Sequence, residues 1–321
     1  MKKIFPVMIL TFTMAVLSRS AIGERHYPSG GAVNGSLTVD GIQRTYYLYV
    51  PEKYTGRKSV PLLIVLHGGG GRGKRTEEKT TLNGFDRLAD KEGFLVVYPD
   101  AVENHWNDGR NNPYSYAARQ NLNDVKFISA LIDHLGNKYN LDLKRVYATG
   151  VSNGGMMSFR LACELPDRIA AIATVAASML ETLYDHCTPQ HPVSVLIIHG
   201  TDDPLVPWNG GDVVAFGQHR GTVVPVPQSV EFWVKHNHCT LQKGKTWLPD
   251  KDPRDGTRVW KEVYINRDDK VRVVFYGIEG GGHTWPDGFS SLPRVTGKIT
   301  HDINACRVIW DFFREVGKIN K

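Results

Sequence analysis

The sequence lacks the features of a membrane-embedded, disordered or repetitive protein. Beyond its N-terminal segment it has no apolar, charge-free run of the roughly 18 residues that a membrane helix needs. It also has no internal repeat, no low-complexity tract and no Ser/Thr/Pro-rich linker. With 41% hydrophobic and 22% charged residues among 321, the composition is that of an ordinary globular chain. We therefore expect no membrane span and a single domain over residues 30–321.

The N-terminal segment has the layout of a secretory signal. Lys2 and Lys3 precede an apolar run over residues 4–17, and the small residues Ala21 and Gly23 follow it. The run is too short to span a bilayer. The pattern predicts a signal peptide over residues 1–23 and a mature protein that is secreted or periplasmic.

The chain carries only a small excess of positive over negative residues. The formal net charge is +6, but Lys2, Lys3 and Arg19 lie in the predicted signal, which leaves +3 on the mature chain. That excess is too small to indicate a nucleic-acid partner. The basic cluster at residues 72–75 is interpreted as a solvated loop.

Cysteine is scarce, with four residues at positions 163, 187, 239 and 306. An even number in an exported chain favours up to two disulfides, and three connectivities are open. The simplest guess pairs neighbours along the chain, Cys163 with Cys187 and Cys239 with Cys306. The segment 236–239, His-Asn-His-Cys, has no second ligand pair at a zinc-like spacing, so we interpret it as the end of a surface helix and expect no metal site.

Apolar runs alternate with stretches of helical periodicity. Two strand-like runs over residues 36–50 flank the hairpin turn Asp40-Gly41. Further strands are predicted at 60–66, 94–98, 145–149, 169–175, 193–199 and 271–276, with helices at 82–91, 123–139, 154–165, 228–236 and 303–316. The charged stretch 244–270 is interpreted as an added loop and hairpin at the sheet edge. The alternation predicts an α/β fold with a mostly parallel, doubly wound sheet and helices on both faces.

A Gly-x-Ser-x-Gly motif follows the strand at 145–149 and precedes a predicted helix, with Ser152 at its centre. The pattern alone is common, but the strand-turn-helix context makes it specific. A turn this tight needs small flanking residues, and it pushes the serine hydroxyl into the open above the sheet. Ser152 is thus the candidate nucleophile, although such a motif can also be only a tight turn.

A glycine run, 68–71, follows the strand at 60–66, where hydrolases of this fold place their oxyanion loop. We expect one oxyanion donor from the backbone of Gly69 or Gly70 and the other from Asn153. A flexible turn or a phosphate loop are the alternatives, but the residues after the last glycine do not fit a phosphate loop.

Two further motifs follow buried strands and complete a Ser, Asp, His order along the chain. Asp203, in the segment 199–204, is the candidate acid, with neighbouring Asp202 as the alternative, and His283 is the candidate base. Singly, each could cap a loop or close a turn. His67 and His199 stand at strand ends and are expected to support loops. Each motif lies at the carboxyl end of a strand, where ligands bind in open α/β sheets.

Two tryptophans are candidates for substrate binding. Trp285 lies two residues after the candidate base, and Trp106 lies in a polar, glycine-containing loop. Both are expected at the rim of the pocket, where an indole ring stacks on aromatic or sugar faces. The alternative for each is simple loop packing.

These motifs resemble the secreted poly(3-hydroxybutyrate) depolymerase-like and feruloyl esterase family, carbohydrate esterase family one of the α/β-hydrolase superfamily. The resemblance covers most of the mature chain and rests on the segments 66–70, 106–110, 150–156, 199–204 and 282–286. In that family the acid ends a Gly-x-x-Asp element, which here is Asp203. Polymer-degrading members often carry an added binding domain; this chain shows none, which favours soluble esters or oligomers.

The resemblance implies an α/β-hydrolase fold and a secreted serine esterase that cleaves feruloyl or acetyl sugar esters through an acyl-enzyme. This reaction needs no metal and no organic cofactor. A small-molecule or oligosaccharide ester is the expected partner, and the oligomeric state is open. A hydroxybutyrate oligomer or polyester depolymerase is the main alternative. A peptidase of the prolyl-oligopeptidase kind and a non-catalytic carbohydrate-binding protein on the same fold are the others.

Overall fold

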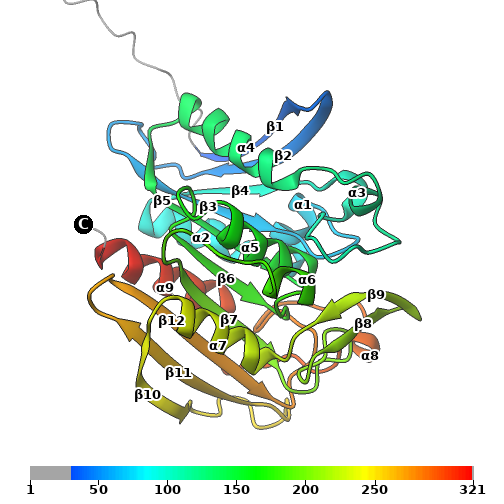
Figure 1. Ribbon diagram of the computed structural model, residues 1–321. Helices are drawn as coiled ribbons and strands as arrows, with labels where there is room; N and C mark the ends of the chain where they lie inside the picture. Colours follow the sequence, from blue (N-terminus) through cyan, green and yellow to red (C-terminus); the bar gives the residue numbers. More distant parts are fainter. Residues whose placement is uncertain (1–29, 320–321) are drawn as a thin grey trace, which may run out of the picture.

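The computed structural model describes residues 30–319, and Figure 1 shows the chain as a ribbon. The predicted signal peptide, residues 1–23, lies outside the described residues. Within them, a ten-stranded sheet has the order β1-β2-β4-β3-β5-β6-β7-β12-β11-β10. Its strands are β1 (Gly31–Val39), β2 (Ile42–Val50), β3 (Val60–Leu66), β4 (Leu95–Pro99), β5 (Leu141–Val151), β6 (Ala171–Val175), β7 (Ser194–Gly200), β10 (Thr240–Trp247), β11 (Arg258–Asn266) and β12 (Val271–Glu279).

The middle of the sheet is parallel and its two edges are antiparallel. Strands β4, β3, β5, β6, β7 and β12 pair in parallel. At one edge β1 and β2 form the predicted hairpin, in which Asp40 and Gly41 have φ of 51° and 78°, the left-handed pair that a tight hairpin turn requires. Strands β3, β4, β6 and β7 are buried along almost their whole length, as expected of strands covered on both faces.

Helices cover both faces of the sheet and enclose two apolar cores (Figure 1). The long helices are α2 (Gly84–Glu92), α4 (Asp124–Lys138), α5 (Asn153–Glu164), α7 (Val226–His236) and α9 (Ala305–Ile319). One core holds residues of α4, α5 and α7, and the other holds residues of α2 and α9. The predicted fold class, a mostly parallel α/β sheet of the hydrolase type, is confirmed, and element boundaries shift by a few residues only.

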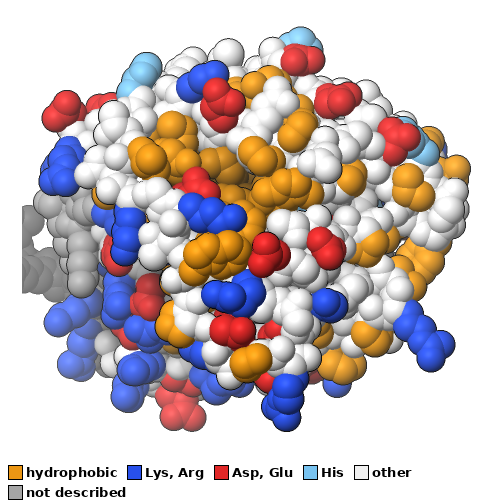
Figure 2. Space-filling view, turned by 90° about the horizontal axis from the view of Figure 1, so that it is seen from below, with side chains coloured by type: hydrophobic (Ala, Val, Ile, Leu, Met, Phe, Trp, Pro, Cys, Tyr) orange, Lys and Arg blue, Asp and Glu red, His pale blue; other side chains and the backbone are white. Residues whose placement is uncertain are grey.

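The far edge of the sheet is the hairpin predicted within residues 244–270. Strands β10 and β11 pair antiparallel, and β11 continues the sheet next to β12. Figure 2 views the molecule from below Figure 1, the side on which β10 and β11 lie, and shows apolar side chains gathered among charged ones. Leu241 and Trp247 of β10 are exposed large apolar residues.

The shorter elements were not predicted. They are α1 (Gly73–Arg75), the π-helix η1 (Thr76–Thr80), η2 (Val102–Asn104), α3 (Tyr116–Arg119), α6 (Glu181–Tyr184), α8 (Pro293–Thr296) and a separate hairpin of β8 (Gly211–Ala215) and β9 (Gln218–Val223). The basic cluster at 72–75 therefore begins a short helix rather than forming a loop throughout. No helix within residues 30–319 is long and apolar enough to cross a membrane.

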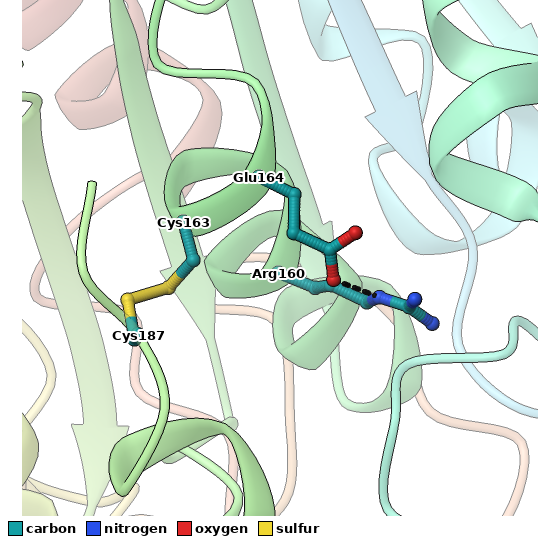
Figure 3. The surroundings of a disulfide bond; sticks show 4 residues. All are labelled: Arg160, Cys163, Glu164 and Cys187. Carbon is teal, nitrogen blue, oxygen red and sulfur yellow. Dashed lines mark hydrogen bonds and ion pairs between the residues drawn. A yellow bond between two sulfur atoms is a disulfide. The ribbon is translucent and has the colours of Figure 1, made fainter. Parts of the chain in front are cut away.

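One disulfide joins Cys163 of α5 to Cys187, which follows α6 (Figure 3). The first half of the predicted pairing is confirmed. The second half is wrong, because Cys239 and Cys306 are free and buried. Cys239 belongs to the core that holds α7, whereas Cys306 belongs to the core under α9. The sheet separates the two thiols, so no disulfide can join them.

Candidate active site

Ser152 stands on a strained turn between β5 and α5. Its backbone φ of 56° and ψ of −123° are unusual for a residue with a side chain. The turn is so tight that a Cβ on Gly150 would lie 2.4 Å from the carbonyl carbon of Gly154, and a Cβ on Gly154 would lie 2.3 Å from the Leu66 carbonyl oxygen. Only glycine fits either position. This is the geometry of a nucleophile elbow.

Asp203 and His283 are in direct contact. Nδ1 of His283 lies 2.8 Å from Oδ2 of Asp203. The other carboxylate oxygen, Oδ1, accepts the backbone N–H groups of Leu205 at 2.9 Å and Val206 at 2.8 Å. Asp202 instead accepts the hydroxyl of the neighbouring Thr201 at 2.9 Å. Of the two candidate acids, the structure brings Asp203 to His283.

The charge on Asp203 is stabilised by its surroundings. Burial opposes ionisation, but the interaction with His283, His199 and the Val206 N–H outweighs it and holds the pKa of Asp203 below its usual value. The side chain of Asp203 is fully buried. The carboxylate is therefore fixed, dry and ionised, as a residue that orients a histidine must be.

The loop that carries His283 is pinned by the segment behind it. The Gly282 N–H donates to the Lys298 carbonyl at 3.0 Å, and the His283 N–H donates to the Thr296 carbonyl at 2.6 Å. A Cβ on Gly282 would lie 2.2 Å from the Thr296 oxygen. Glycine at 282 allows the two backbone segments to approach closely. The two hydrogen bonds then fix the backbone that carries the His283 ring.

Of the two glycines proposed as oxyanion donors, one is already engaged. The Gly70 N–H donates to the Asn104 carbonyl at 2.8 Å. The Gly69 N–H has no such partner among the described residues. Asn153 begins α5, so its N–H is one of those that a helix start leaves unpaired. Gly69 and Asn153 are therefore the donors that remain free, and Gly70 is corrected to a structural role.

The Asn153 side chain is locked by the loop after η2. Its Oδ1 accepts the Trp106 N–H at 2.8 Å, and its Nδ2 donates to the Trp106 carbonyl at 3.1 Å and to Oδ2 of Asp108 at 2.6 Å. Asp108 in turn pairs with Nε of Arg110 at 3.1 Å. These contacts fix the first residue of α5, and with it the direction of the backbone donor.

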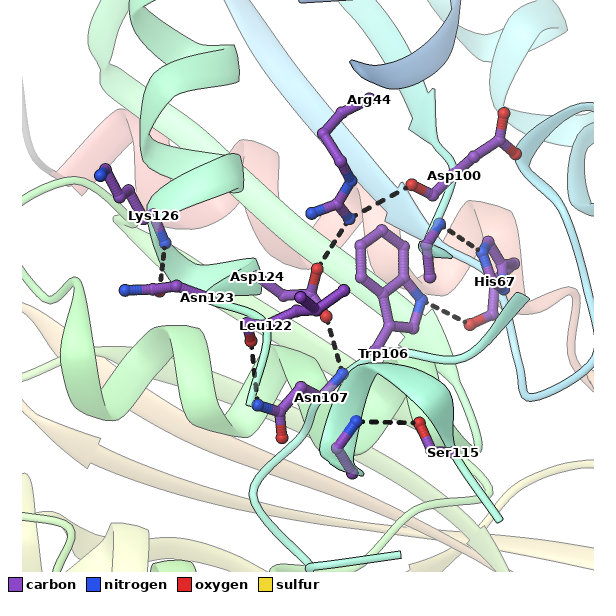
Figure 4. Close-up of polar contacts among 12 residues, drawn as sticks. Arg44, His67, Asp100, Trp106, Asn107, Ser115, Leu122, Asn123, Asp124 and Lys126 are labelled. Atoms are coloured by element: carbon purple, nitrogen blue, oxygen red, sulfur yellow. Dashed lines mark hydrogen bonds and ion pairs between the residues drawn. The ribbon is translucent and has the colours of Figure 1, made fainter. Parts of the chain in front are cut away.

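A buried ion pair anchors the same loop to the sheet (Figure 4). Arg44 of β2 pairs with Asp124 at 2.7 Å. The second oxygen of Asp124 accepts the Asn107 N–H at 2.7 Å, and the Asn107 side chain donates to the Leu122 carbonyl at 2.9 Å. A chain of polar contacts thus runs from the sheet edge to the start of α5.

Trp106 does not lie at the pocket rim, which corrects the expectation from the sequence. Its side chain is 1% exposed. The indole Nε1 donates to the His67 carbonyl at 3.0 Å (Figure 4), and the ring stacks on Phe127. A tryptophan in a polar loop is here a core residue, because the loop carbonyl satisfies its single donor.

Trp285 lines the cavity but is only 3% exposed. Its ring meets Phe85 edge-on. Trp285 therefore borders the cavity, but most of its side chain is packed in the core rather than exposed at a rim.

His67 and His199 support loops, as expected. Burial lowers the pKa of His67 to about 4, and its Nε2 accepts the Ala101 N–H at 3.0 Å. Burial also lowers the pKa of His199, whose Nε2 lies 3.8 Å from Oδ2 of Asp203. Both rings are neutral and buried.

Ser152 and His283 line one cavity of about 310 Å³ at the carboxyl end of the sheet. Among the described residues no hydrogen bond joins their side chains, and such contacts often form only when substrate is bound. Gly69 and Asn153 line the cavity as well. The candidate nucleophile, the candidate base and the two residues with free backbone donors thus line the same cavity.

The described residues contain no group of three or more His, Cys, Asp or Glu side chains that could hold a metal ion.

A family model described as the alpha/beta hydrolase fold matches residues 61–193. The protein NocK of Nocardia uniformis subsp. tsuyamanensis, named for a proposed esterase activity, is 32% identical over 293 residues, which cover 86% of this chain and 80% of NocK. The chain belongs to the α/β-hydrolase esterases. It is a carboxylic ester hydrolase.

Other relatives are named for plant cell-wall esters. Feruloyl esterase B of Piromyces equi is 30% identical over 74% of this esterase, which spans only 42% of that longer protein. Among solved structures, acetyl xylan esterase from Aspergillus awamori matches with a TM-score of 0.57 and 15% identity, covering 88% of this chain and 99% of the other. The ferulic acid esterase of Anaeromyces mucronatus matches with a TM-score of 0.54 and 15% identity, covering 91% and 93%. At these identities the two structures show the shared fold.

One wall of the esterase's cavity was not predicted from the sequence. Val213, Ala215, Phe216 and Arg220 of the β8–β9 hairpin line it. The hairpin turn is Phe216-Gly217, with φ of 53° and 73°. Because Phe is uncommon in such a turn, only Gly217 could have signalled it.

Proposed function

We propose that this esterase is a secreted serine hydrolase that cleaves feruloyl or acetyl sugar esters through an acyl-enzyme. The observation that carries the proposal is the 2.8 Å contact of Asp203 with His283, which lines the same cavity as Ser152. Ser152 is the nucleophile, His283 the base and Asp203 the acid.

In the first half-reaction His283 takes the proton of the Ser152 hydroxyl, and Oγ attacks the ester carbonyl carbon. The N–H groups of Gly69 and Asn153 donate hydrogen bonds to the carbonyl oxygen and stabilise the negative charge that develops on it. The tetrahedral intermediate collapses as His283 gives its proton to the leaving alcohol. The acyl group then remains on Ser152.

In the second half-reaction water takes the place of the alcohol. His283 removes a proton from the water, which attacks the acyl carbonyl, and the same backbone donors hold the oxyanion. Collapse returns the proton to Ser152 and releases the acid. Asp203 orients His283 in both halves and stabilises its charged form.

The substrate class is supported by the relatives named as feruloyl esterases and as an acetylxylan esterase/xylanase. The cavity offers apolar side chains for a planar ring, including those of Leu205, Phe289 and Trp285. Oligomers of hydroxybutyrate remain the alternative substrate. The contact between the buried Asp203 carboxylate and His283 argues against the non-catalytic alternative, because a binding protein does not need it.

A panel of esters tests the proposal. The purified protein should hydrolyse 4-nitrophenyl acetate, methyl ferulate and acetylated xylo-oligosaccharides, and a serine-directed fluorophosphonate should abolish all three activities. Faster turnover of hydroxybutyrate oligomers than of any feruloyl or acetyl-sugar ester would replace the substrate class. No turnover of any ester, with no labelling of Ser152, would support the non-catalytic alternative.

Export is part of the proposal and has its own test. The disulfide between Cys163 and Cys187 fits an oxidising compartment. Expression of the full chain in a secreting host should yield a protein whose N-terminus lies after residue 23. Recovery of the uncleaved chain inside the cells alone would contradict export.

A further inference from the structure

The cavity wall carries basic side chains and no acidic ones among the described residues. Three arginines, Arg75, Arg110 and Arg220, line it together with His283, and no Asp or Glu of the described chain does. Ester hydrolysis as proposed above uses none of these arginines. The excess of positive charge therefore needs a separate explanation.

Arg220 of β9 has no carboxylate partner. Its Nη2 donates to Oε1 of Gln218 at 3.0 Å, and its Nη1 lies 3.4 Å from Nε2 of His105. Its Nε is buried and has no hydrogen-bond partner among the described residues. Burial, and then the charge of Arg110, lower the pKa of Arg220. The guanidinium thus has unused donors in a partly dry site.

Arg110 brings a second guanidinium to the same corner. The place where a Cβ on Gly221 would stand is 2.7 Å from the Arg110 carbonyl oxygen, so β9 lies directly against Arg110. Arg110 is paired with Asp108, but the same Oδ2 atom of Asp108 also accepts from Asn153. The Asp108 carboxylate is therefore shared between Arg110 and the side chain of Asn153, whose backbone N–H is a candidate oxyanion donor.

His105 places this corner beside the oxyanion loop. Its ring lies 3.1 Å from the point where a Cβ on Gly69 would stand. Burial, opposed by a hydrogen bond to the Glu103 backbone, lowers the pKa of His105, and the charges of Arg220 and Arg110 lower it further. Arg110 and Arg220 are thus close enough to influence His105, which lies beside Gly69, one of the two residues with a free backbone donor.

Among the described residues Arg220 has no carboxylate partner, and the only carboxylate at this corner already pairs with Arg110, so a bound anion would satisfy the unused donors of Arg220. A guanidinium presents a planar fork of N–H donors that matches a carboxylate. We propose that the cavity selects esters that also carry a free carboxylate, which binds to Arg220 beside Arg110. This inference rests on the proposed esterase function and names a property of its substrate.

Two kinds of molecule supply this chemistry. One is an acetylated or feruloylated sugar unit that bears a uronate carboxylate, and the other is the free acid end of a hydroxy-acid oligomer. Because both present the same group near an ester, two matched substrate pairs distinguish them. The first pair is an acetylated methyl glucuronide and the corresponding acetylated methyl glucoside. The second is a hydroxybutyrate dimer with a free carboxyl group and its primary amide.

The test measures the ratio of kcat/KM for the charged and the neutral member of each pair. We expect the wild type to favour the charged member of at least one pair by about tenfold or more, and the favoured pair identifies the source. In 0.5 M NaCl this preference should fall, because salt screens partly exposed charges. In Arg220→Gln, kcat/KM should fall about tenfold more on the charged member than on the neutral one.

Two further variants make the result specific. Arg220→Lys keeps the charge but loses the fork, so it should restore part of the preference. Arg267→Gln removes an exposed arginine from the turn before β12, at the end of that strand opposite the cavity, and should leave both ratios unchanged.

The inference and the esterase assignment fail in different ways. A wild type that hydrolyses the neutral esters but shows no preference for the charged members overturns the carboxylate site and leaves the esterase intact. Equal losses on both members in Arg220→Gln also overturn it. Absence of turnover on every ester refutes the esterase reaction itself.

Discussion

Nδ1 of His283 lies 2.8 Å from Oδ2 of Asp203, although the two residues are 80 positions apart in the chain. Because the Asp203 carboxylate is ionised, this contact assigns the proton to Nδ1 and leaves the lone pair on Nε2 of His283 free. The opposite oxygen of Asp203 is held by two backbone N–H groups. The acid therefore cannot turn away from the histidine without breaking those bonds.

The first prediction compares the two adjacent acids. Asp203→Asn should lower kcat by about 10⁴, because an amide no longer fixes the tautomer of His283. Asp202→Asn should lower it by no more than a few-fold, since Asp202 bonds only to Thr201. Steady-state kinetics on one chromogenic ester measure both. Equal losses, or a larger loss in Asp202→Asn, would mean that the wrong carboxylate has been assigned.

The second prediction concerns pH. A histidine that acts as general base must be neutral, so kcat/KM should rise with pH across the neutral range. The pKa of Asp203 is held below its usual value, so this carboxylate stays ionised from pH 5 to 8 and does not shape the profile. A flat profile over pH 5 to 8 would exclude His283 as the base.

The third prediction concerns the disulfide between Cys163 and Cys187, which are 24 residues apart. Cys163→Ser should lower the free energy of unfolding by about 3 kcal/mol, because the bond restricts the unfolded chain. The wild type with its disulfide reduced is the control, and it should show a similar loss. Peptide mapping without reductant should find one linked pair and two thiols. Four thiols, or a link to Cys239 or Cys306, would contradict the structure.

The fourth prediction concerns two buried acids behind the cavity wall. Burial raises the pKa of Glu77 to about 9, and its hydrogen bond to Asp86 adds to the shift. The folded protein thus holds a proton that the unfolded chain releases near pH 4.5. Stability contributed by this group is lost as pH rises from that value towards 9.

Glu77→Gln removes the ionisation but keeps a hydrogen-bond donor for Asp86. Its Tm should therefore exceed that of the wild type by a few degrees at pH 8.5, and the difference should shrink or reverse at pH 5. Calorimetry at the two pH values measures this. The same Tm difference at both pH values would show that Glu77 does not hold a proton in the folded state.

The fold, and the strand ends after which Ser152, Asp203 and His283 stand, were predictable because each depends on local pattern. Buried parallel strands are continuous apolar runs, and each candidate residue stands just after one of them. The close backbone contacts at Gly150 and Gly154 demand glycine, so the requirement is visible in the sequence itself.

What could not be predicted depends on contacts between distant segments. Cys239 and Cys306 lie on opposite faces of a sheet whose strand order the sequence does not state. Trp106 is buried because the His67 carbonyl, 39 positions away, accepts its N–H. Arg220 reaches the cavity through a hairpin whose turn begins with Phe216, a residue that rarely marks one.

The central claim is that Ser152 is the nucleophile, and Ser152→Ala tests it most directly. A control is Ser158→Ala, in which a buried serine of α5, the helix that follows Ser152, loses only its hydrogen bond to the Gly154 carbonyl. Circular dichroism should show both variants folded, and Ser158→Ala should keep most of its activity. Ser152→Ala should lower turnover of a chromogenic ester by about 10⁶. A folded Ser152→Ala protein whose turnover stays within about tenfold of the wild type would contradict the account.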